Sequence, residues 1–425
     1  MKRPVAIDLF AGCGGMSLGL EAAGFDIAAA VEFDAVHSMV HHFNFPYTST
    51  ICKDISKLKS SELLNAVKEN GYSQDIDVIA GGPPCQGFSQ IGKRQLDDPR
   101  NSLVFEYLRI IKDIRPKYFI FENVPGIASG KHKKFLDELI IEFEAIGYNI
   151  AKPISILDAS LYGAPQKRKR LILIGSRNDM PMALYPSQTH DNSIDSTEML
   201  PLTTVGQAIS DISRIPAFIG NDLGIPMDAM DYSGFRENYS FVPSGIFKLC
   251  HKRTVEHIVF NHVGSNHTEK SMNKFSATLP GTTEKTSRFF KLAVDGQCNT
   301  LRAGTASDKG AYTAARPIHY EVPRCITVRE AARLHSFPDW FQFHSTIWHS
   351  FREIGNAVIP MFSKAIGDQI IKALNVDTSK LNRMNLSSIN RSLLSYNMGQ
   401  ASEYWDVPND VIAKRKRLDK EVVNG

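Results

Sequence analysis

The feature that most constrains the fold of this 425-residue chain is a regular alternation of short apolar runs with helix-like segments over its first 177 residues. Apolar runs of strand length lie at 5–10, 27–33, 76–80, 118–122 and 171–175, and apolar residues recur at helical spacing at 16–23, 103–114 and 135–146. Such alternation is typical of βαβ units, in which helices connect the strands of a parallel sheet. The sequence therefore predicts an open, doubly wound α/β sheet in this part of the chain.

The composition is that of an ordinary globular protein, with 43% hydrophobic and 22% charged residues. A formal net charge of +4 allows a polyanionic partner without requiring one. The six cysteines are scattered without Cys-x-x-Cys spacing, which indicates a reducing compartment rather than a disulfide scaffold. The chain starts with a polar segment and has no long apolar run, so we expect a cytoplasmic protein with no membrane partner.

The texture of the sequence changes at about residue 178. From there to about 322 it is rich in Ser, Thr, Asn, Gly and Pro, which predicts an irregular second domain. Helical patterns return at 327–335 and 358–374, and the last fifty residues are polar. We expect a first domain over 1–177, a second over 178–345, a segment over 346–375 that returns to the first domain, and a polar extension over 376–425.

A glycine-rich turn follows the first predicted strand. Gly12, Gly14 and Gly15 would let the backbone approach a ligand closely, and Glu32 lies 20 residues beyond Gly12, at the end of the next strand. A carboxylate at that place can accept hydrogen bonds from ribose hydroxyls, so this turn indicates a site for an adenosine-containing cofactor. The pattern G-x-G-G differs from the G-x-G-x-x-G of NAD-binding folds, and glycine-rich turns are also common as plain turns.

A second turn, Gly81–Ser89, presents Cys85. Two Gly and two Pro stop the preceding strand there, so the thiol is expected at a strand end, where an ionised Cys is a strong nucleophile. Most buried cysteines are inert, so the other segments of the chain decide the interpretation. These are residues 8–15 (DLFAGCGG), 122–124 (ENV), 166–170 (QKRKR) and 355–358 (GNAV).

In this order, these segments resemble the motifs of the DNA (cytosine-5) methyltransferases over residues 5–375, apart from the region 178–322. The resemblance implies a doubly wound mixed sheet of the S-adenosylmethionine-dependent methyltransferase type with a smaller, irregular target-recognition domain. Residues 1–177 would then form the catalytic and cofactor-binding domain, and 178–345 the target-recognition domain. S-adenosylmethionine would contact Phe10, Gly12, Gly14, Glu32, Phe33, Asp54, Ile55, Pro84, Leu103, Asn356, Ala357 and Val358.

The resemblance also assigns the chemistry to four residues: Cys85, Glu122, Arg168 and Arg170. The thiolate of Cys85 would add to C6 of a cytosine, so that C5 can attack the sulfonium methyl group. A protonated Glu122 would relieve the charge at N3, and Arg170 would hydrogen-bond the base carbonyl. Arg168 would position backbone or phosphate, while the base that removes the C5 proton is not assigned.

The target atom is inaccessible in a stacked duplex, so the base must be flipped out of the helix. The loop 86–101 would close over it, with Ser89, Ile91, Lys93, Arg94 and Arg100 as DNA contacts, and Thr300 and Leu301 would contact DNA from the second domain. The expected partner is duplex DNA, bound by a monomer. A restriction endonuclease acting on the same site without a stable complex would complete a restriction-modification system.

Three alternatives remain open at this point. A tRNA cytosine-5 methyltransferase could use the same scaffold, although the large insert and basic loop favour duplex DNA. A non-catalytic DNA-binding regulator is disfavoured by Cys85, Glu122 and the arginine pair, and an NAD oxidoreductase by the G-x-G-G turn. No metal is expected, because the cluster of Cys250 with nearby histidines fits no standard zinc spacing.

Overall fold

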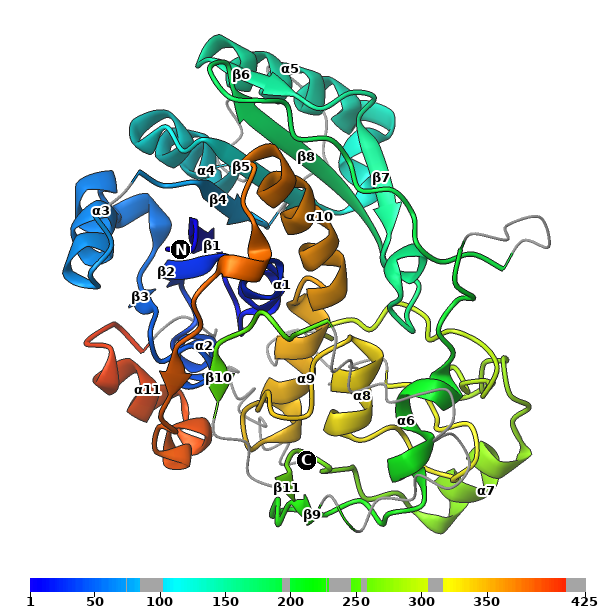
Figure 1. Ribbon diagram of the computed structural model, residues 1–425. Helices are drawn as coiled ribbons and strands as arrows, with labels where there is room; N and C mark the ends of the chain where they lie inside the picture. The colour runs from blue at the N-terminus through cyan, green and yellow to red at the C-terminus, as the bar shows by residue number, and fades with distance from the viewer. Residues whose placement is uncertain are drawn as a thin grey trace, which may run out of the picture.

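The computed structural model describes residues 1–73, 75–84, 102–192, 199–226, 228, 246–253, 258–304 and 316–409 (Figure 1). Its centre is an eight-stranded sheet in the order β3-β2-β1-β4-β5-β8-β6, with β7 also pairing with β8. The strands β3, β2, β1, β4 and β5 are parallel, and β8 runs antiparallel to β5, β6 and β7, so the predicted mixed α/β sheet is confirmed. The bounds are β1 (Val5–Leu9), β2 (Asp26–Glu32), β3 (Ser49–Cys52), β4 (Val78–Gly81), β5 (Tyr118–Asn123), β6 (Tyr148–Ile150), β7 (Ser155–Asp158) and β8 (Lys169–Arg177).

Helices cover both faces of this sheet. On one face lie α1 (Gly15–Ala23) and α10 (Pro360–Ala373), and on the other lie α3 (Ser60–Glu69), α4 (Ser102–Ile114) and α5 (Lys133–Ala145). Successive residues of β1 face opposite sides, so Ala6 packs with α1 and α10 while Ile7 packs with the helices of the other face. Both faces are buried, which explains why the strands are continuous apolar runs in the sequence.

The strand ends meet at one edge of the sheet. Leu9 of β1 pairs with Gly81 of β4, and Gly81 pairs with Phe121 of β5, so these three strands end side by side. Because β8 is antiparallel to β5, the start of β8 lies at the same edge, where Asn123 pairs with Leu171. Ligands of open α/β sheets bind at the carboxyl ends of the strands. This edge is therefore where a site is expected.

Some elements differ from the sequence-based prediction. The strand expected at 76–80 begins at Val78, because the Asp77 side chain accepts a hydrogen bond from the Val5 backbone and forms an ion pair with Lys117. The helix α2 (Ala35–Asn44) was not predicted. Its N-cap is Asp34, whose side chain accepts hydrogen bonds from two backbone N–H groups of the first turn.

The part of the chain beyond the sheet has short regular elements joined by long irregular segments (Figure 1). They are α6 (Val205–Ser213), β9 (Ile225–Pro226), β10 (Lys252–Arg253), β11 (Ile258–Val259), α7 (Glu269–Ala277), α8 (Val328–Leu334) and α9 (Ile347–Asn356). A hydrophobic cluster shared by α6, α8 and α9 also includes Leu18 of α1 and Val40 of α2, so the two parts have a common core. Residues just after β8 still pack on the sheet, since Tyr118 donates to the carbonyl of Pro181.

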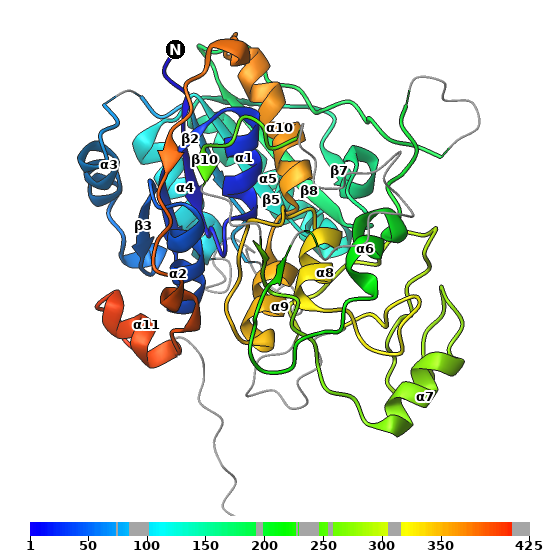
Figure 2. The ribbon, with the colours of Figure 1, turned by 60° about the horizontal axis from the view of Figure 1, so that its bottom comes forward.

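The chain after α10 returns to the first part of the molecule. A two-residue strand, β12 (Asn385–Leu386), pairs with β10, and α11 (Met398–Tyr404) lies beside α2, as the second view also shows (Figure 2). The predicted polar extension is therefore folded as far as residue 409, where the described region ends. In the described part of the chain, no helix has the length and apolar character needed to cross a membrane.

Candidate active site

The glycine-rich turn connects β1 to α1, and the end of α2 packs directly against it. Gly14 has a φ of 103°, and a Cβ on it would lie 2.4 Å from the Phe45 ring, so both the conformation and the space require glycine. Glu32, at the end of β2, accepts hydrogen bonds of 2.8 Å from the backbone N–H groups of Gly12 and Asp34. The carboxylate is thereby fixed against the turn and oriented toward the strand-end edge.

The other residues predicted to contact a cofactor lie at or near the ends of several helices and strands. The Phe33 side chain is 51% exposed directly after Glu32, while Ile55 is buried beyond β3 and Asp54 caps the short turn that contains it. A Cβ on Gly15 would lie 2.2 Å from the Val358 carbonyl oxygen, so the segment after α9 touches the turn directly. That segment holds the predicted residues Ala357 and Val358, and the predicted residue Asn356 is the last residue of α9. Phe10 (φ 62°) and Pro84 lie at the ends of β1 and β4, and Leu103 lies in the first turn of α4.

A buried polar chain beneath the turn escaped the sequence-based prediction. Ser17 donates to Asp8 at 2.6 Å and also lies 3.0 Å from His41 Nε2, whose other ring nitrogen is 3.3 Å from Thr50. Burial raises the pKa of Asp8 to about 7 and lowers the pKa of His41 to about 3, so His41 is neutral at physiological pH. These hydrogen bonds connect Ser17 of α1 and His41 of α2 to residues of β1 and β3.

At the neighbouring strand ends, Glu122 and Arg170 form an ion pair of 2.7 Å from Oε1 to Nε. A Cβ on Gly82 would lie 2.7 Å from the other carboxylate oxygen of Glu122, so any larger residue here would displace that oxygen. Asn123, one residue on, donates to the carbonyl of Pro83 at 3.2 Å. The Glu122 carboxylate, with Arg170 bound to it, therefore lies against Gly82 in the segment that leads directly to Cys85.

Arg168 has a different role from Arg170. Its side chain is buried and donates to the carbonyls of Leu301 at 2.9 Å and Gly355 at 2.8 Å. Burial lowers the pKa of this guanidinium to about 9, which is still a charged group at neutral pH. Arg168 thus joins β8 to a segment of the second part and to the end of α9, an arrangement that suits a positioning residue.

The segment that contains Thr300 and Leu301 lies along residues 166–168. Thr300 donates to the carbonyl of Lys167, and the backbone N–H of Leu301 donates to the side chain of Gln166. The Leu301 side chain is buried in the core, whereas Thr300 is partly exposed. The buried Gln166 side chain also donates to the carbonyl of Leu334, so it connects three separate segments of the chain. Its position in the basic run 166–170 gave no indication of this structural role.

Six predicted site residues lie outside the described residues: Cys85, Ser89, Ile91, Lys93, Arg94 and Arg100. Among the residues that the structure does describe, no group of three or more His, Cys, Asp or Glu side chains could hold a metal ion. His251, from the cluster noted in the sequence, instead pairs with Asp26 at 3.0 Å.

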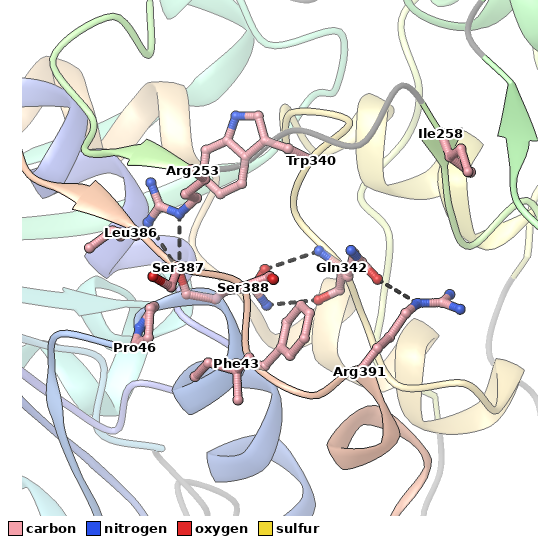
Figure 3. A pocket seen from close by; sticks show the side chains of 12 residues that line it. Phe43, Pro46, Arg253, Ile258, Trp340, Gln342, Leu386, Ser387, Ser388 and Arg391 are labelled. Atoms are coloured by element: carbon pink, nitrogen blue, oxygen red, sulfur yellow. Dashed lines mark hydrogen bonds between the residues drawn. The ribbon is translucent and has the colours of Figure 1, made fainter.

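A pocket lies between the end of α2, Trp340 and residues 386–391 (Figure 3). Its two arginines are already paired, Arg253 with Glu21 and Arg391 with Asp222, each at 2.7 Å. None of its lining residues belongs to the glycine-rich turn or to the Glu122–Arg170 pair. We therefore place the chemistry at the strand ends and not in this pocket.

A mixed sheet of this order, with a glycine-rich turn bound to an acidic residue of the next strand, has the fold of the S-adenosylmethionine-dependent methyltransferases. The chain belongs to the C-5 cytosine-specific DNA methylase family, whose sequence model matches residues 5–372. It is therefore an enzyme, a DNA cytosine C5-methyltransferase.

Individual relatives agree with this assignment. The Type II methyltransferase M.XorII of Xanthomonas oryzae pv. oryzae is 45% identical over 98% of this chain and 96% of its own, and M.DdeI of Desulfomicrobium norvegicum is 33% identical over 92% and 94%. A crystal structure described as a prophage-encoded DNA modification methyltransferase from E. coli has a TM-score of 0.69, 33% identity and coverage of 88% of this chain and 100% of that chain. These relatives do not favour a tRNA methyltransferase, a non-catalytic regulator or an NAD oxidoreductase.

Proposed function

We propose that this enzyme transfers a methyl group from S-adenosylmethionine to C5 of a cytosine within a specific sequence of duplex DNA, and that Cys85 is the nucleophile. The observation that carries this proposal is the meeting of Glu122 and Arg170 at the segment that leads to Cys85. A thiolate from Cys85 adds to C6 of the cytosine, which makes C5 nucleophilic. Loss of the C5 proton and departure of the thiolate then restore the aromatic ring.

The residues of the glycine-rich turn fit an adenosine-containing cofactor. Glu32 offers carboxylate oxygens that are already oriented by two backbone N–H groups, and the exposed ring of Phe33 beside it suits stacking on an adenine. When bound, S-adenosylmethionine supplies an electrophilic methyl group on a sulfonium. The chain's own contribution is to orient that cofactor between the turn and residues 356–358.

Glu122 and Arg170 act on the base. Addition of the thiolate places negative charge on the cytosine ring, and a proton held by Glu122 at N3 relieves it. Arg170 donates to the carbonyl oxygen of the base from a position fixed by its bond to Glu122. Arg168 holds the segment at Leu301 and the end of α9 in register with these groups.

The cytosine reaches this site only after rotation out of the duplex. Ser89, Ile91, Lys93, Arg94 and Arg100 would hold the DNA from the loop after Cys85, and Thr300 would contact it from the other side. Leu301, which the sequence suggested as a further DNA contact, is buried in the core and would only support the segment of Thr300 from within. The remainder of the region 178–345 would read the sequence. We propose a cytoplasmic monomer that modifies the recognition site of a separately acting restriction endonuclease.

The test is covalent trapping on DNA whose target cytosine is replaced by 5-fluorocytosine. The fluorine cannot leave as a proton does, so the wild-type enzyme should remain bound to such DNA through denaturing electrophoresis in the presence of cofactor. The Cys85→Ser variant should form no adduct. Cys250→Ser serves as the control, because this buried cysteine precedes His251, which bonds Glu21 in the last turn of α1, away from the glycine-rich turn. Bisulfite mapping of DNA from expressing cells supplies the cognate duplex, and absence of a wild-type adduct on it would refute the mechanism.

A further inference from the structure

The C-terminal segment 389–407, here called the brace, lies across the start of α2 (Figures 1 and 2). Leu393 and Ala401 of the brace are buried in one hydrophobic cluster with Val36 and Met39 of α2. Trp405 packs against the same cluster, and its ring lies 5.7 Å from that of His42. The brace therefore covers the face of α2 that does not contact the main core.

Polar contacts fix the brace at both ends of α2. At the start, the indole N–H of Trp405 donates to the carbonyl of Ala35 at 3.2 Å. At the end, Arg391 donates to the side chain of Gln342 at 2.8 Å, and Gln342 exchanges hydrogen bonds with Asn44, as the dashed lines in Figure 3 show. The helix is thus held along its whole length by a segment more than 340 residues away in sequence.

The end of α2 held by Trp405 adjoins the residues proposed to bind adenosine. Ala35 follows Asp34, whose backbone N–H donates to Glu32 and whose side chain pairs with Arg352 of α9 at 3.3 Å. Arg352 lies one turn before the segment 356–358, so the ion pair joins the two chain segments that flank the glycine-rich turn.

The brace reaches α9 as well. His344 lies with Nε2 3.0 Å from the carbonyl of Tyr396, and its own backbone N–H donates to the buried carboxylate of Glu353. Ser345 donates to the carbonyl of Leu394 at 2.8 Å. Both sides of the proposed pocket, at Glu32–Asp34 and at α9, are therefore bound to one short segment.

We propose that the brace positions the adenosine side of the cofactor pocket, with Trp405 as the positioning residue. This inference rests on the proposed use of S-adenosylmethionine. Loss of the Trp405 contacts frees the first turn of α2, and with it Phe33 and the Asp34–Arg352 pair, without touching the groups that act on cytosine. The consequence is weaker cofactor binding with unchanged handling of DNA.

Three full-length variants test this inference. Trp405→Ala removes the ring and the hydrogen-bond donor, Trp405→Phe keeps a ring without the N–H, and Glu403→Gln alters an exposed residue of α11, the helix that ends just before Trp405. S-adenosylhomocysteine is the probe for calorimetry, because it does not react. Losing the partly buried ring together with its hydrogen bond should raise the Kd for S-adenosylhomocysteine about tenfold or more, and losing the hydrogen bond alone about two- to tenfold. We expect Glu403→Gln to bind as wild type, and the KM for DNA and the kcat at saturating cofactor to stay within about twofold in all three.

Equal Kd values for wild type and Trp405→Ala would overturn this inference and leave the proposed function intact. The same conclusion would follow if Trp405→Ala raised the KM for DNA as much as the Kd for the probe. Failure of the wild type to bind the probe would overturn the proposed cofactor as well. If Trp405→Ala does not fold, hydrogen exchange on the wild type decides, since coupling between two sites is reciprocal. Adding the probe should slow amide exchange in residues 391–405 along with residues 33–40, and unchanged exchange in 391–405 would reject the proposal.

Discussion

Arg170 Nε lies 2.7 Å from Glu122 Oε1, and strand register alone brings the two side chains together. Glu122 pairs with Ile172, and Arg170 lies two residues before Ile172 on β8, so both groups come from the ends of adjacent antiparallel strands. Side chains on such a scaffold need little reorganisation when a substrate arrives. An arginine and a carboxylate are therefore preorganised where the charge of the proposed reaction develops.

Replacing Glu122 by Gln should separate proton donation from cofactor binding. The amide of Glu122→Gln would keep a hydrogen-bonding group but has no carboxyl proton to hold at N3, so we expect kcat to fall about 10²–10⁴-fold. The Kd for S-adenosylhomocysteine should stay near the wild-type value, because Glu32 and the turn are unaffected. Single-turnover methyl transfer at saturating DNA measures the effect, and a rate within about threefold of wild type would remove Glu122 from the mechanism.

Gly82→Ala should impair the same step by a steric route. The added Cβ would lie 2.7 Å from Glu122 Oε2, so the end of the Glu122 side chain must shift from the position in which its other oxygen pairs with Arg170. We expect a loss of at least about tenfold in kcat, since small displacements of a catalytic group are costly. Gly126→Ala is the matched control, because a Cβ there meets nothing within 4 Å. Equal rates for the two variants would contradict the proposed role of Glu122.

Glu32→Ala should weaken the cofactor and leave the base chemistry intact. The carboxylate is a charged acceptor for ribose and also binds Gly12 and Asp34, so its loss should cost about 1.5–3 kcal/mol of binding free energy. Calorimetry with S-adenosylhomocysteine measures this directly. Glu62→Ala, which removes an exposed carboxylate of α3, is the control, and an unchanged Kd for Glu32→Ala would remove Glu32 from the site.

Much of the fold could be predicted from the sequence because buried parallel strands leave continuous apolar runs. The helix α2 could not be predicted, since its start depends on the Asp34 cap. Its three histidines also interrupt the apolar pattern, so the sequence does not reveal the face that the brace buries. The brace itself is polar in composition, and only its few apolar residues, such as Leu393 and Trp405, enter the core.

For the site, the motif order predicted a set of candidate residues, but it could not show which contacts each of their side chains makes in the fold. Arg168 directly precedes β8 and Arg170 lies at its start, yet Arg168 bonds two backbone carbonyls and Arg170 bonds a carboxylate. The roles of Gln166 and the Asp34–Arg352 pair depend on segments more than 100 residues away. Such contacts are set by tertiary packing and leave no local pattern.

The pH dependence of stability should show a contribution from Glu353. Burial raises the pKa of Glu353 from about 4.5 to about 8, so between these values the folded protein holds a proton that the unfolded chain releases. Stability should therefore fall as the pH rises through this window. Buried histidines such as His41, with a pKa lowered to about 3, oppose this below about pH 6.5 and no longer titrate above it.

Between about pH 6.5 and 8, the Glu353→Gln variant should then lose roughly 1–2 kcal/mol less stability than the wild type. Urea unfolding at the two pH values measures the difference. Glu62→Gln, at an exposed carboxylate, should keep the wild-type slope. Parallel pH profiles for wild type and Glu353→Gln would show that Glu353 does not carry its proton in the folded state.

The region that reads the DNA sequence can be tested by transplantation. Since Tyr118 and Tyr162 donate hydrogen bonds to the carbonyls of Pro181 and Pro186, residues up to 186 are attached to the part of the molecule that contains the sheet. The exchanged segment should therefore begin at 187 and end at 322. A hybrid with this segment from a relative of different specificity should methylate the relative's sequence with unchanged cofactor affinity. An active hybrid that still marks the original sequence would place recognition elsewhere.

The contact between Gly15 and the Val358 carbonyl has a consequence for biosynthesis. The glycine-rich turn lies within the first fifteen residues, but one wall of the proposed cofactor pocket is formed only when residue 358 has been synthesised. A chain translated only to a point before residue 358 lacks this wall of the proposed pocket. Contacts between such distant residues also form late in folding. The nascent enzyme should therefore stay inert until residue 358 has left the ribosome, however early the first strands are synthesised.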